Sequence, residues 1–385
     1  MKILLIGEYS GLHNSLKDGL QLNGHSVTLL GTGDGFKRYP VDILIKSTFF
    51  EIPIFKFIAK IIDKLLKVSL NDIEIGIKTY FKIKRLKDFD VVQLINENSF
   101  KTIPNLEIIL LKKIKKNNKN LFLLSCGTDY KSVQYTLNKN FRYSILTPYF
   151  NNEKLKNSYR HILKYNNKHF KKLHEYIYKN IKGVISSDLD YHIPLKKEDK
   201  YLGMIPNPIN LNKIKYNKLK IDGEIIIFHG INTKNSIKKG NNYFQKAMEI
   251  IKKLHGNKVK YIEVKNLNYN DYVKSYESCH IFLDQVYAYD QGYNALEAMA
   301  KGKVVFTGAE KEWLDHYNLI EDSIAINALP ETNYLVDKLN ELINNPEKIE
   351  SISVNARKFI ENHHDFKNIA SIYEDKWLKA LKNEK

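Results

Sequence analysis

A glycine followed by a helical stretch with one glutamate is the segment of this sequence best suited to chemistry. It covers residues 291–308 and reads QGYNALEAMAKGKVVFTG. Gly292 precedes the helix, whose first backbone N–H groups and positive dipole end could hold a phosphate. Glu297 follows about one turn later, where its carboxylate could accept hydrogen bonds from ribose hydroxyls. Taken alone, the segment fits an ordinary strand–helix–strand crossover with a surface glutamate equally well.

A second segment places lysines after an expected buried strand. It covers residues 225–240 and reads IIIFHGINTKNSIKKG, so the strand ends at His229-Gly230 and three lysines follow it: Lys234, Lys238 and Lys239. Lysines at the carboxyl end of a strand suit a diphosphate, which needs point positive charges and little geometry. In isolation, a solvated basic loop is the simpler interpretation.

Short apolar runs alternate with helical stretches from end to end, which predicts repeated strand–helix–strand units. Continuous apolar strands are typical of a parallel sheet that helices cover on both faces. Helices are expected, for example, at 239–254 and 293–301. The expected strands are 2–7, 25–31, 42–46, 90–96, 120–127, 183–188, 225–230, 259–264, 281–285 and 303–308.

A polar segment with two prolines, near 205–222, is the expected boundary between two halves. The 385 residues exceed one ordinary core, and each half has its own strand series. We therefore expect an α/β protein with two doubly wound, Rossmann-like domains facing across a cleft, at 1–205 and 206–365. Residues 366–385 should form a helix that packs back toward the N-terminal domain through Ile369, Ile372, Trp377 and Leu381.

The composition excludes several classes of protein. Apolar residues at 43% and charged residues at 27% exclude a disordered or collagen-like chain. Two distant cysteines and an opening MKILLIG without a signal-peptide pattern predict a reducing, cytoplasmic setting. The net charge of +18 favours a polyanionic partner such as nucleic acid, anionic lipid or a phosphorylated substrate, although a solvated lysine-rich surface also explains it.

Three ordered segments resemble the C-terminal half of the GT-B glycosyltransferases, most closely family 4. That family has an I-P-N-G-V-D-like interdomain motif, a K-G donor-phosphate motif and a glycine–helix segment containing E-A-M-A. Here they are Ile205-Pro206-Asn207, Lys239-Gly240 and Gly292 through Val304. In the N-terminal half, residues 7–30 resemble the family's first strand, glycine loop and helix, and SCGTDYK at 125–131 resembles its H-G-T-D segment.

The resemblance implies a retaining transferase that uses a nucleoside diphosphate sugar as co-substrate and requires no metal or other cofactor. Lys239 would contact the donor diphosphate, and Lys234 would replace the family's loop arginine. Glu297 would bind the ribose, and Asp129 would lie near the acceptor side of the cleft. The other expected donor contacts are Gly11 at the pyrophosphate, the backbone of Tyr293 and Asn294 at the distal phosphate and sugar, and His229, Gly230 and Gly292.

The sequence departs from the family pattern at the expected sugar contact. The family has two glutamates with seven residues between them, but Tyr289, eight positions before Glu297, stands where the first would be. Asp290 or Asp284 could supply this carboxylate. The family's loop arginine is also absent after Gly230, and Cys126 stands where a histidine is common.

Two further classes of function stay open. A sugar-nucleotide epimerase shares the two-domain architecture. A basic, non-enzymatic nucleic-acid-binding protein would use residues 154–182, where lysines interleave with Tyr159, Tyr165, Tyr176 and Tyr178. The resemblance disfavours nucleic acid as a partner. It also disfavours metal binding by the D-x-D triplet Asp188-Leu189-Asp190.

An amphipathic stretch at 51–70 predicts either a core helix or a helix at a membrane surface. Its lysines, Lys56, Lys60, Lys64 and Lys67, fall within one narrow arc. No apolar run reaches the roughly 18–20 residues of a membrane span. The resemblance implies a cytoplasmic enzyme that transfers sugar to a glycan or lipid-linked acceptor in bacterial-type surface polysaccharide or glycolipid synthesis. If 51–70 forms the membrane-surface helix, the enzyme would be peripheral on an anionic membrane.

Overall fold

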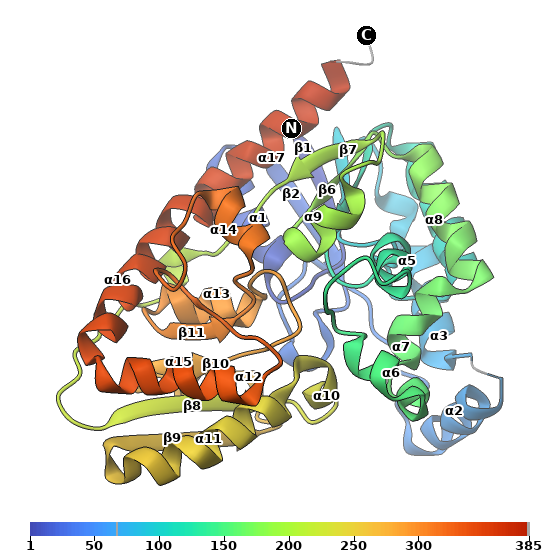
Figure 1. Cartoon of the computed structure of the whole chain (residues 1–385). Coiled ribbons are helices and arrows are strands. Elements are labelled where there is room, and N and C mark those ends of the chain that lie inside the picture. Colours follow the sequence, from blue (N-terminus) through green and yellow to red (C-terminus); the bar gives the residue numbers. More distant parts are fainter. Residues whose placement is uncertain (67, 383–385) are drawn as a thin grey trace.

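Two parallel β-sheets, each covered by helices on both faces, make up the computed structural model of the chain (Figure 1). The structure describes residues 1–66 and 68–382. Successive residues of a strand point to opposite faces, so each sheet has an apolar cluster on either side. In the first strand, Ile3 and Leu5 belong to one cluster, whereas Leu4 and Ile6 belong to the other.

The N-terminal sheet has seven parallel strands in the order β3-β2-β1-β4-β5-β6-β7. Their bounds are β1 Lys2–Ile6, β2 Ser26–Gly31, β3 Ile43–Leu44, β4 Val91–Leu94, β5 Leu121–Ser125, β6 Gly183–Ser186 and β7 Tyr201–Met204. The helices between them are α1 Leu12–Leu22, α2 Pro53–Leu66, α3 Leu70–Lys82, α4 Pro104–Asn117, α5 Tyr130–Leu137, α6 Thr147–Asn151, α7 Arg160–Leu163, α8 Lys168–Asn180 and α9 Leu189–Leu195.

The C-terminal sheet has five parallel strands in the order β12-β11-β10-β8-β9. Their bounds are β8 Ile225–Ile231, β9 Val259–Lys265, β10 Ile281–Leu283, β11 Val304–Thr307 and β12 Ile326–Asn327. Its helices are α10 Ser236–Lys239, α11 Asn241–His255, α12 Tyr269–Ser275, α13 Tyr293–Ala300, α14 Lys311–Tyr317, α15 Thr332–Asn344 and α16 Pro346–His363.

The predicted fold class is confirmed: both sheets are doubly wound. All ten expected strands are present, with ends that shift by a few residues. The strands β7 and β12 were not predicted. β7 is only partly buried, and β12 has two residues, so neither produces the apolar run by which the others were recognised.

Two chain segments cross between the sheets side by side. Ile209 donates its N–H to the carbonyl of His364 at 2.7 Å, and Phe366 donates its N–H to the carbonyl of Ile209 at 3.2 Å. The chain then continues as α17, Phe366–Lys382, which runs along α1 (Figure 1). We propose 1–205 and 206–365 as the two domains, with 366–385 as the segment that returns to the first.

The returning helix α17 packs closely on the N-terminal domain. Trp377 is fully buried, and its indole N–H donates to Oε1 of Gln93 at 2.9 Å. Gly19 of α1 allows the close approach, because a Cβ there would lie 2.4 Å from the carbonyl oxygen of Phe366. Ile369 is buried as well, whereas Ile372 is 41% exposed.

Trp377→Ala should therefore lower the free energy of unfolding by about 3–5 kcal/mol, because it opens a cavity and leaves Gln93 unpaired. The matched change Ile372→Ala, on the exposed face of the same helix, should cost no more than about 0.5 kcal/mol. Urea unfolding followed by circular dichroism measures both. Equal losses in the two variants would contradict this packing of α17.

Candidate active site

The two sheets turn the carboxyl ends of their strands toward each other's domain, and the strand order reverses at one point in each. In the N-terminal sheet the reversal lies between β1 and β4, and in the C-terminal sheet between β8 and β10. Ligands of doubly wound sheets bind at such switch points, outside the carboxyl ends of the strands. The loops expected to contact a ligand are therefore 7–11 and 95–101 in one domain and 232–240 and 284–292 in the other.

Lys239 and Asp284 meet at the switch point of the C-terminal sheet. The Nζ of Lys239 lies 2.7 Å from Oδ1 of Asp284, whose side chain is only 3% exposed. Thr307 donates its hydroxyl to the other carboxylate oxygen at 3.3 Å. An ammonium group has three donors and this ion pair uses one of them, so Lys239 is held in place and has further N–H donors for a ligand. Lys234 is exposed on the preceding loop.

Gly240 lets the chain turn directly from Lys239 into α11. Its φ of 68° lies in the left-handed region, and a Cβ at this position would be 2.2 Å from Cγ2 of Val286. Any larger residue would push the loops after β8 and β10 apart. The positive φ and the contact with Val286 therefore explain why a glycine follows Lys239 in the sequence.

His229 is buried beneath this loop and does not face the cleft. Its Nδ1 lies 2.8 Å from the hydroxyl of Tyr261, and its Nε2 lies 2.7 Å from Nδ2 of Asn241. Burial lowers the pKa of the ring to about 4, so it stays neutral at physiological pH. Gly230 is the next residue and packs under the ring of Tyr272. A Cβ at Gly230 would lie only 2.4 Å from Cε2 of that ring. Both residues position the loop.

The N-terminus of α13 is open. Gly292 has an ordinary φ of −75°, and the nearest atom to a Cβ placed there would be Nε2 of Gln285 at 3.7 Å. Neither backbone strain nor packing explains this glycine, whereas free access to the first N–H groups of the helix does. The side chain of Tyr293 contacts the N-terminal domain and the interdomain segment instead. Its hydroxyl donates to the carbonyl of Pro208 at 2.6 Å and lies 3.0 Å from Oγ of Ser15. Asn294, next along the helix, is partly buried.

Glu297 lies on α13 with its carboxylate against Tyr269. The hydroxyl of Tyr269 donates to Oε1 at 2.9 Å, and burial raises the pKa of Glu297. The positive charge of Lys37, a residue of the N-terminal domain, lowers the pKa of the same carboxylate. Glu297 is thus a partly buried acceptor between the two domains.

Lys37 is the cation that the sequence analysis missed. It lies on the loop after β2, and its Nζ donates to Oγ of Ser10 at 2.9 Å. Burial lowers its pKa, while Asp34 and Glu297 raise it and Lys239 lowers it, which places the ammonium near both candidate donor residues. The signal in the sequence was the turn GDGFK immediately after an expected strand end.

Gly11 is required by its own loop. Its φ is 90°, and a Cβ would meet the ring of Tyr39 at 3.0 Å. Its N–H donates to Oε1 of Glu8 at 2.7 Å, and Glu8 also accepts from both nitrogens of Asn14. Burial raises the pKa of Glu8 to about 7. A carboxylate therefore already occupies the start of α1, where the sequence suggested a close approach of pyrophosphate.

Asp129 is committed to its own helix. Its carboxylate accepts the N–H of Ser132 at 2.8 Å as the N-cap of α5, and it also accepts the hydroxyl of Ser125. The residue is 1% exposed. It shapes the wall of the cleft by fixing α5.

Asp190 and Asp290 exchange hydrogen bonds between the domains. Asp190 accepts the backbone N–H of Tyr289 at 3.2 Å, and Asp290 accepts that of Leu189 at 3.1 Å. Burial and the nearby carboxylates raise the pKa of Asp190 to about 7, and burial raises that of Asp290 to about 6. The D-x-D triplet thus binds backbone. Among the described residues, no group of three or more His, Cys, Asp or Glu is arranged to hold a metal ion.

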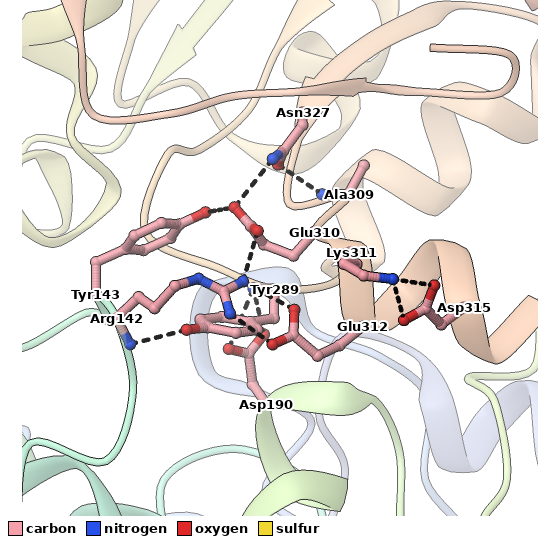
Figure 2. Close-up of polar contacts among 10 residues, drawn as sticks. All are labelled: Arg142, Tyr143, Asp190, Tyr289, Ala309, Glu310, Lys311, Glu312, Asp315 and Asn327. Atoms are coloured by element: carbon pink, nitrogen blue, oxygen red, sulfur yellow. Dashed lines mark hydrogen bonds and ion pairs between the residues drawn. The ribbon is translucent and has the colours of Figure 1, made fainter. Parts of the chain in front are cut away.

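Arg142 joins the N-terminal domain to α14 of the other (Figure 2). Its guanidinium forms ion pairs of 2.6 Å with both Glu310 and Glu312, and its backbone N–H donates to the hydroxyl of Tyr289 at 2.9 Å. The guanidinium also lies over the Tyr289 ring, 4.8 Å from its centre. Tyr289, in place of the family's glutamate, is therefore an interdomain contact.

A cavity of about 220 Å³ lies beside these contacts. The N-terminal domain contributes Thr128 and Ser132, and the C-terminal domain contributes Gln285, Asp290 and Gly292. Of the residues singled out in the sequence, Asp188, Asp190, Asp290 and Gly292 line it, whereas Lys239, Lys234 and Glu297 do not. The candidate donor-phosphate residues and the cavity therefore adjoin at Gly292.

The basic stretch at 154–182 does not present its tyrosines for base stacking. Tyr159 and Tyr165 are 2% and 8% exposed, and Tyr176 and Tyr178 pack on the core. Binding of single-stranded nucleic acid needs exposed aromatic rings, so this surface lacks that feature.

Comparison with known proteins supports the same architecture. A model of the glycosyl transferase-like family matches residues 241–375, whereas no curated protein sequence matches the chain. The sucrose-phosphate synthase of Thermosynechococcus elongatus superposes with a TM-score of 0.63 at 13% identity, covering 100% of both chains. HepE of Anabaena in complex with UDP-glucose has a TM-score of 0.57 at 14% identity, also over 100% of both.

A third structure is described as a UDP-N-acetylglucosamine 2-epimerase of Listeria monocytogenes. It has a TM-score of 0.54 at 9% identity and covers 100% of this chain and 96% of its own. At these identities the superpositions establish the fold alone, and the family match covers most of the C-terminal domain. The chain thus has the two-domain fold of the GT-B glycosyltransferases, and its residues 241–375 match the glycosyl transferase-like family.

Proposed function

We propose that the protein transfers a sugar, with retention of configuration, from a nucleoside diphosphate sugar to a glycan or lipid-linked acceptor. The observation that carries the proposal is the Lys239–Asp284 pair at the switch point, next to the open helix N-terminus at Gly292. Together they offer fixed positive charge and free N–H groups to a diphosphate. The UDP-glucose bound to the structurally similar HepE supports a uridine nucleotide as donor.

The reaction places new negative charge on the leaving diphosphate. Lys239, Lys234 and the backbone N–H groups of Tyr293 and Asn294 would stabilise it, since charges fixed in a dry site need no reorganisation. Lys37 would approach from the other domain as the cleft closes. Glu297 would exchange its hydrogen bond from Tyr269 for those of the ribose hydroxyls.

The cavity beside Gly292 would take the transferred sugar and the acceptor group. Three carboxylates line it: Asp188, Asp190 and Asp290. We assign the sugar contact to Asp290, because it adjoins Tyr289, which stands in place of the family's glutamate, and because Asp284 is paired with Lys239. Among the described residues no helix is long and apolar enough to cross a bilayer. From the resemblance to family 4 and the basic stretches at 51–70 and 154–182, we infer that the enzyme acts in surface polysaccharide or glycolipid synthesis at the cytoplasmic face of a membrane.

A sugar-nucleotide epimerase is the second candidate, because the Listeria structure shares this fold. Such an enzyme would convert the donor without any acceptor. Incubation of the protein with UDP-sugars alone, followed by analysis of the sugar products, separates the two functions. A changed sugar still attached to its nucleotide would favour the epimerase.

The positive charge of Lys239 can be tested without leaving Asp284 buried and unpaired. Asp284→Asn keeps the cation, whereas Lys239→Gln combined with Asp284→Asn replaces the ion pair by two amides. The double variant should lose on the order of 10²-fold or more in kcat/KM, and Asp284→Asn alone should lose much less. Turnover with UDP-glucose and acceptor measures both. Equal activity of the two variants would refute the role of Lys239.

Glu297→Gln should weaken binding of UDP-glucose about tenfold, which corresponds to loss of charge-assisted hydrogen bonds to ribose. The thermal shift caused by the ligand reports this, because a ligand that binds only the folded state raises the melting temperature. GDP-, ADP- and CMP-sugars serve as comparisons. An unchanged shift would exclude Glu297 from the donor site.

Transfer should continue in excess EDTA. The lysines and helix N-terminus supply the positive charge that a divalent ion would otherwise bring. Loss of activity that manganese or magnesium restores would instead indicate a metal-dependent transferase.

Arg142→Ala should let the domains open further. The substitution removes both ion pairs with α14 and the contact with the Tyr289 ring (Figure 2). Small-angle scattering should report a larger radius of gyration. The matched variant Lys311→Ala breaks a pair within α14, with Asp315, and should leave the radius unchanged. Identical scattering of wild type and Arg142→Ala would show that this contact does not hold the domains.

A further inference from the structure

One face of α2 leaves large apolar side chains in solvent. The exposed fractions are 69% for Ile54, 67% for Phe57 and 71% for Leu65, while Ala59 on the inner face is buried. The exposed positions recur with the period of a helix and form one continuous surface, the α2 stripe: Ile54, Phe57, Ile58, Ile61 and Leu65. Of the two possibilities that the sequence left open for 51–70, the fold therefore leaves an apolar face outside the core.

A column of lysines runs beside the α2 stripe. Lys56, Lys60 and Lys64 are exposed and four residues apart, so they lie on one side of the helix, next to the apolar positions. Lys56 pairs with Glu51 at 2.6 Å, whereas Lys60 and Lys64 have no ion-pair partner among residues 1–66 and 68–382. Lys67, the fourth lysine of the predicted arc, lies outside the described residues.

The neighbouring helix α3 repeats this pattern on a smaller scale. Ile77 and Phe81 are 51% and 61% exposed, and basic residues follow directly. Lys84 lies over the Phe81 ring, 5.3 Å from its centre. The two helices contact each other (Figure 1), so apolar and basic side chains occur together on both.

The start of α2 is fixed to α3 through Glu74. Its carboxylate accepts the backbone N–H of Thr48 at 2.9 Å and of Phe49 at 3.0 Å, and it pairs with Lys78 at 2.5 Å. These hydrogen bonds hold the loop that leads into α2, and they keep the pKa of Glu74 low although its burial acts in the opposite direction. The exposed stripe therefore belongs to an anchored element.

The short helix α7 links this surface to the cavity. Arg160 donates to both oxygens of Asp63 on α2, at 2.7 and 3.2 Å. Two residues later, Ile162 lines the cavity. A ligand held at the α2 stripe would thus lie one helix away from the site of transfer.

We propose that the α2 stripe and its lysines dock the protein onto an anionic lipid bilayer, with α2 lying in the plane of the interface. An apolar stripe alone would also suit a second copy of this chain. The lysines beside it favour anionic headgroups, because an interfacial helix combines apolar burial with basic residues that reach the lipid phosphates. Delivery of a lipid-linked acceptor through this contact rests on the proposed function, whereas docking itself does not.

Cosedimentation with vesicles tests the docking. Wild type should bind vesicles of phosphatidylcholine and phosphatidylglycerol, and bind phosphatidylcholine alone much less. Phe57→Ser combined with Leu65→Ser should weaken binding at least about tenfold, because both side chains enter the interface. Lys60→Glu combined with Lys64→Glu should weaken it by more than about fivefold per lysine. All four positions are exposed, so the fold should survive.

Matched changes on the C-terminal domain serve as controls. Leu254 and Ile320 are 62% and 80% exposed, and Leu254→Ser with Ile320→Ser should bind vesicles like wild type. Lys253→Glu with Lys258→Glu alters the net charge equally and should have little effect. Equal weakening by the control pairs and the α2 pairs would overturn the proposal, because binding would then follow overall charge or apolarity.

Fluorescence gives a second, direct measurement. Both native tryptophans, Trp313 and Trp377, are buried and should not respond to lipid. Phe57→Trp should shift its emission to the blue when phosphatidylglycerol vesicles are added, whereas Ile320→Trp should not. No shift in Phe57→Trp would contradict insertion of α2.

Two further outcomes separate this proposal from its alternatives. Unchanged vesicle binding by Phe57→Ser with Leu65→Ser, together with loss of a wild-type dimer in sedimentation velocity, would assign the stripe to contacts between copies and overturn the proposal. The variant Lys239→Gln with Asp284→Asn should still bind vesicles. Vesicle binding without donor binding in wild type would leave docking intact and refute only the proposed transfer reaction.

Discussion

All strands of each sheet run in the same direction, and this constraint determines where chemistry can occur. In a parallel sheet every carboxyl end lies at one edge, so the loops that start helices and carry free N–H groups gather there. Here two such edges face each other: Lys37, which donates to Ser10 in the loop after β1, lies close enough to Glu297 and Lys239 for their charges to shift its pKa. The cleft, the anchored lysine and the open start of α13 all follow from that arrangement.

Burial gives the cleft its electrostatic character. It raises the pKa of Glu8 to about 7 and that of Asp290 to about 6, and it lowers the pKa of Lys37. The low dielectric constant of such a buried site strengthens electrostatic interactions with a charged ligand. The Lys239–Asp284 pair fits the same environment, because each charge there has a partner before any donor binds.

The sequence was sufficient to place residues whose position in the fold depends on local spacing. Lys239, Gly240 and Gly292 lie at strand ends and helix starts, which apolar runs and glycines locate. Lys37 and Arg142 were missed, because each acts on the other domain, more than about a hundred residues away along the chain. Asp129 and Gly11 were predicted as ligand contacts, but their local roles as helix cap and turn residue account for their types.

The amphipathic segment at 51–70 shows the same limit. Periodicity revealed its apolar face, yet only tertiary packing decides whether such a face lies inside or outside the fold. In this chain Ala59 faces inward and Phe57 outward, since α3 and α7 cover one side only. Lysine spacing alone could not distinguish the two arrangements.

The most direct measurement is a crystal structure of the protein with uridine diphosphate. The account predicts diphosphate density within hydrogen-bond distance of Lys239 Nζ and of the backbone N–H groups at the start of α13, with the ribose against Glu297. Nucleotide bound elsewhere, or an unoccupied cleft at saturating nucleotide, would contradict the assignment of this cleft as a sugar-nucleotide site.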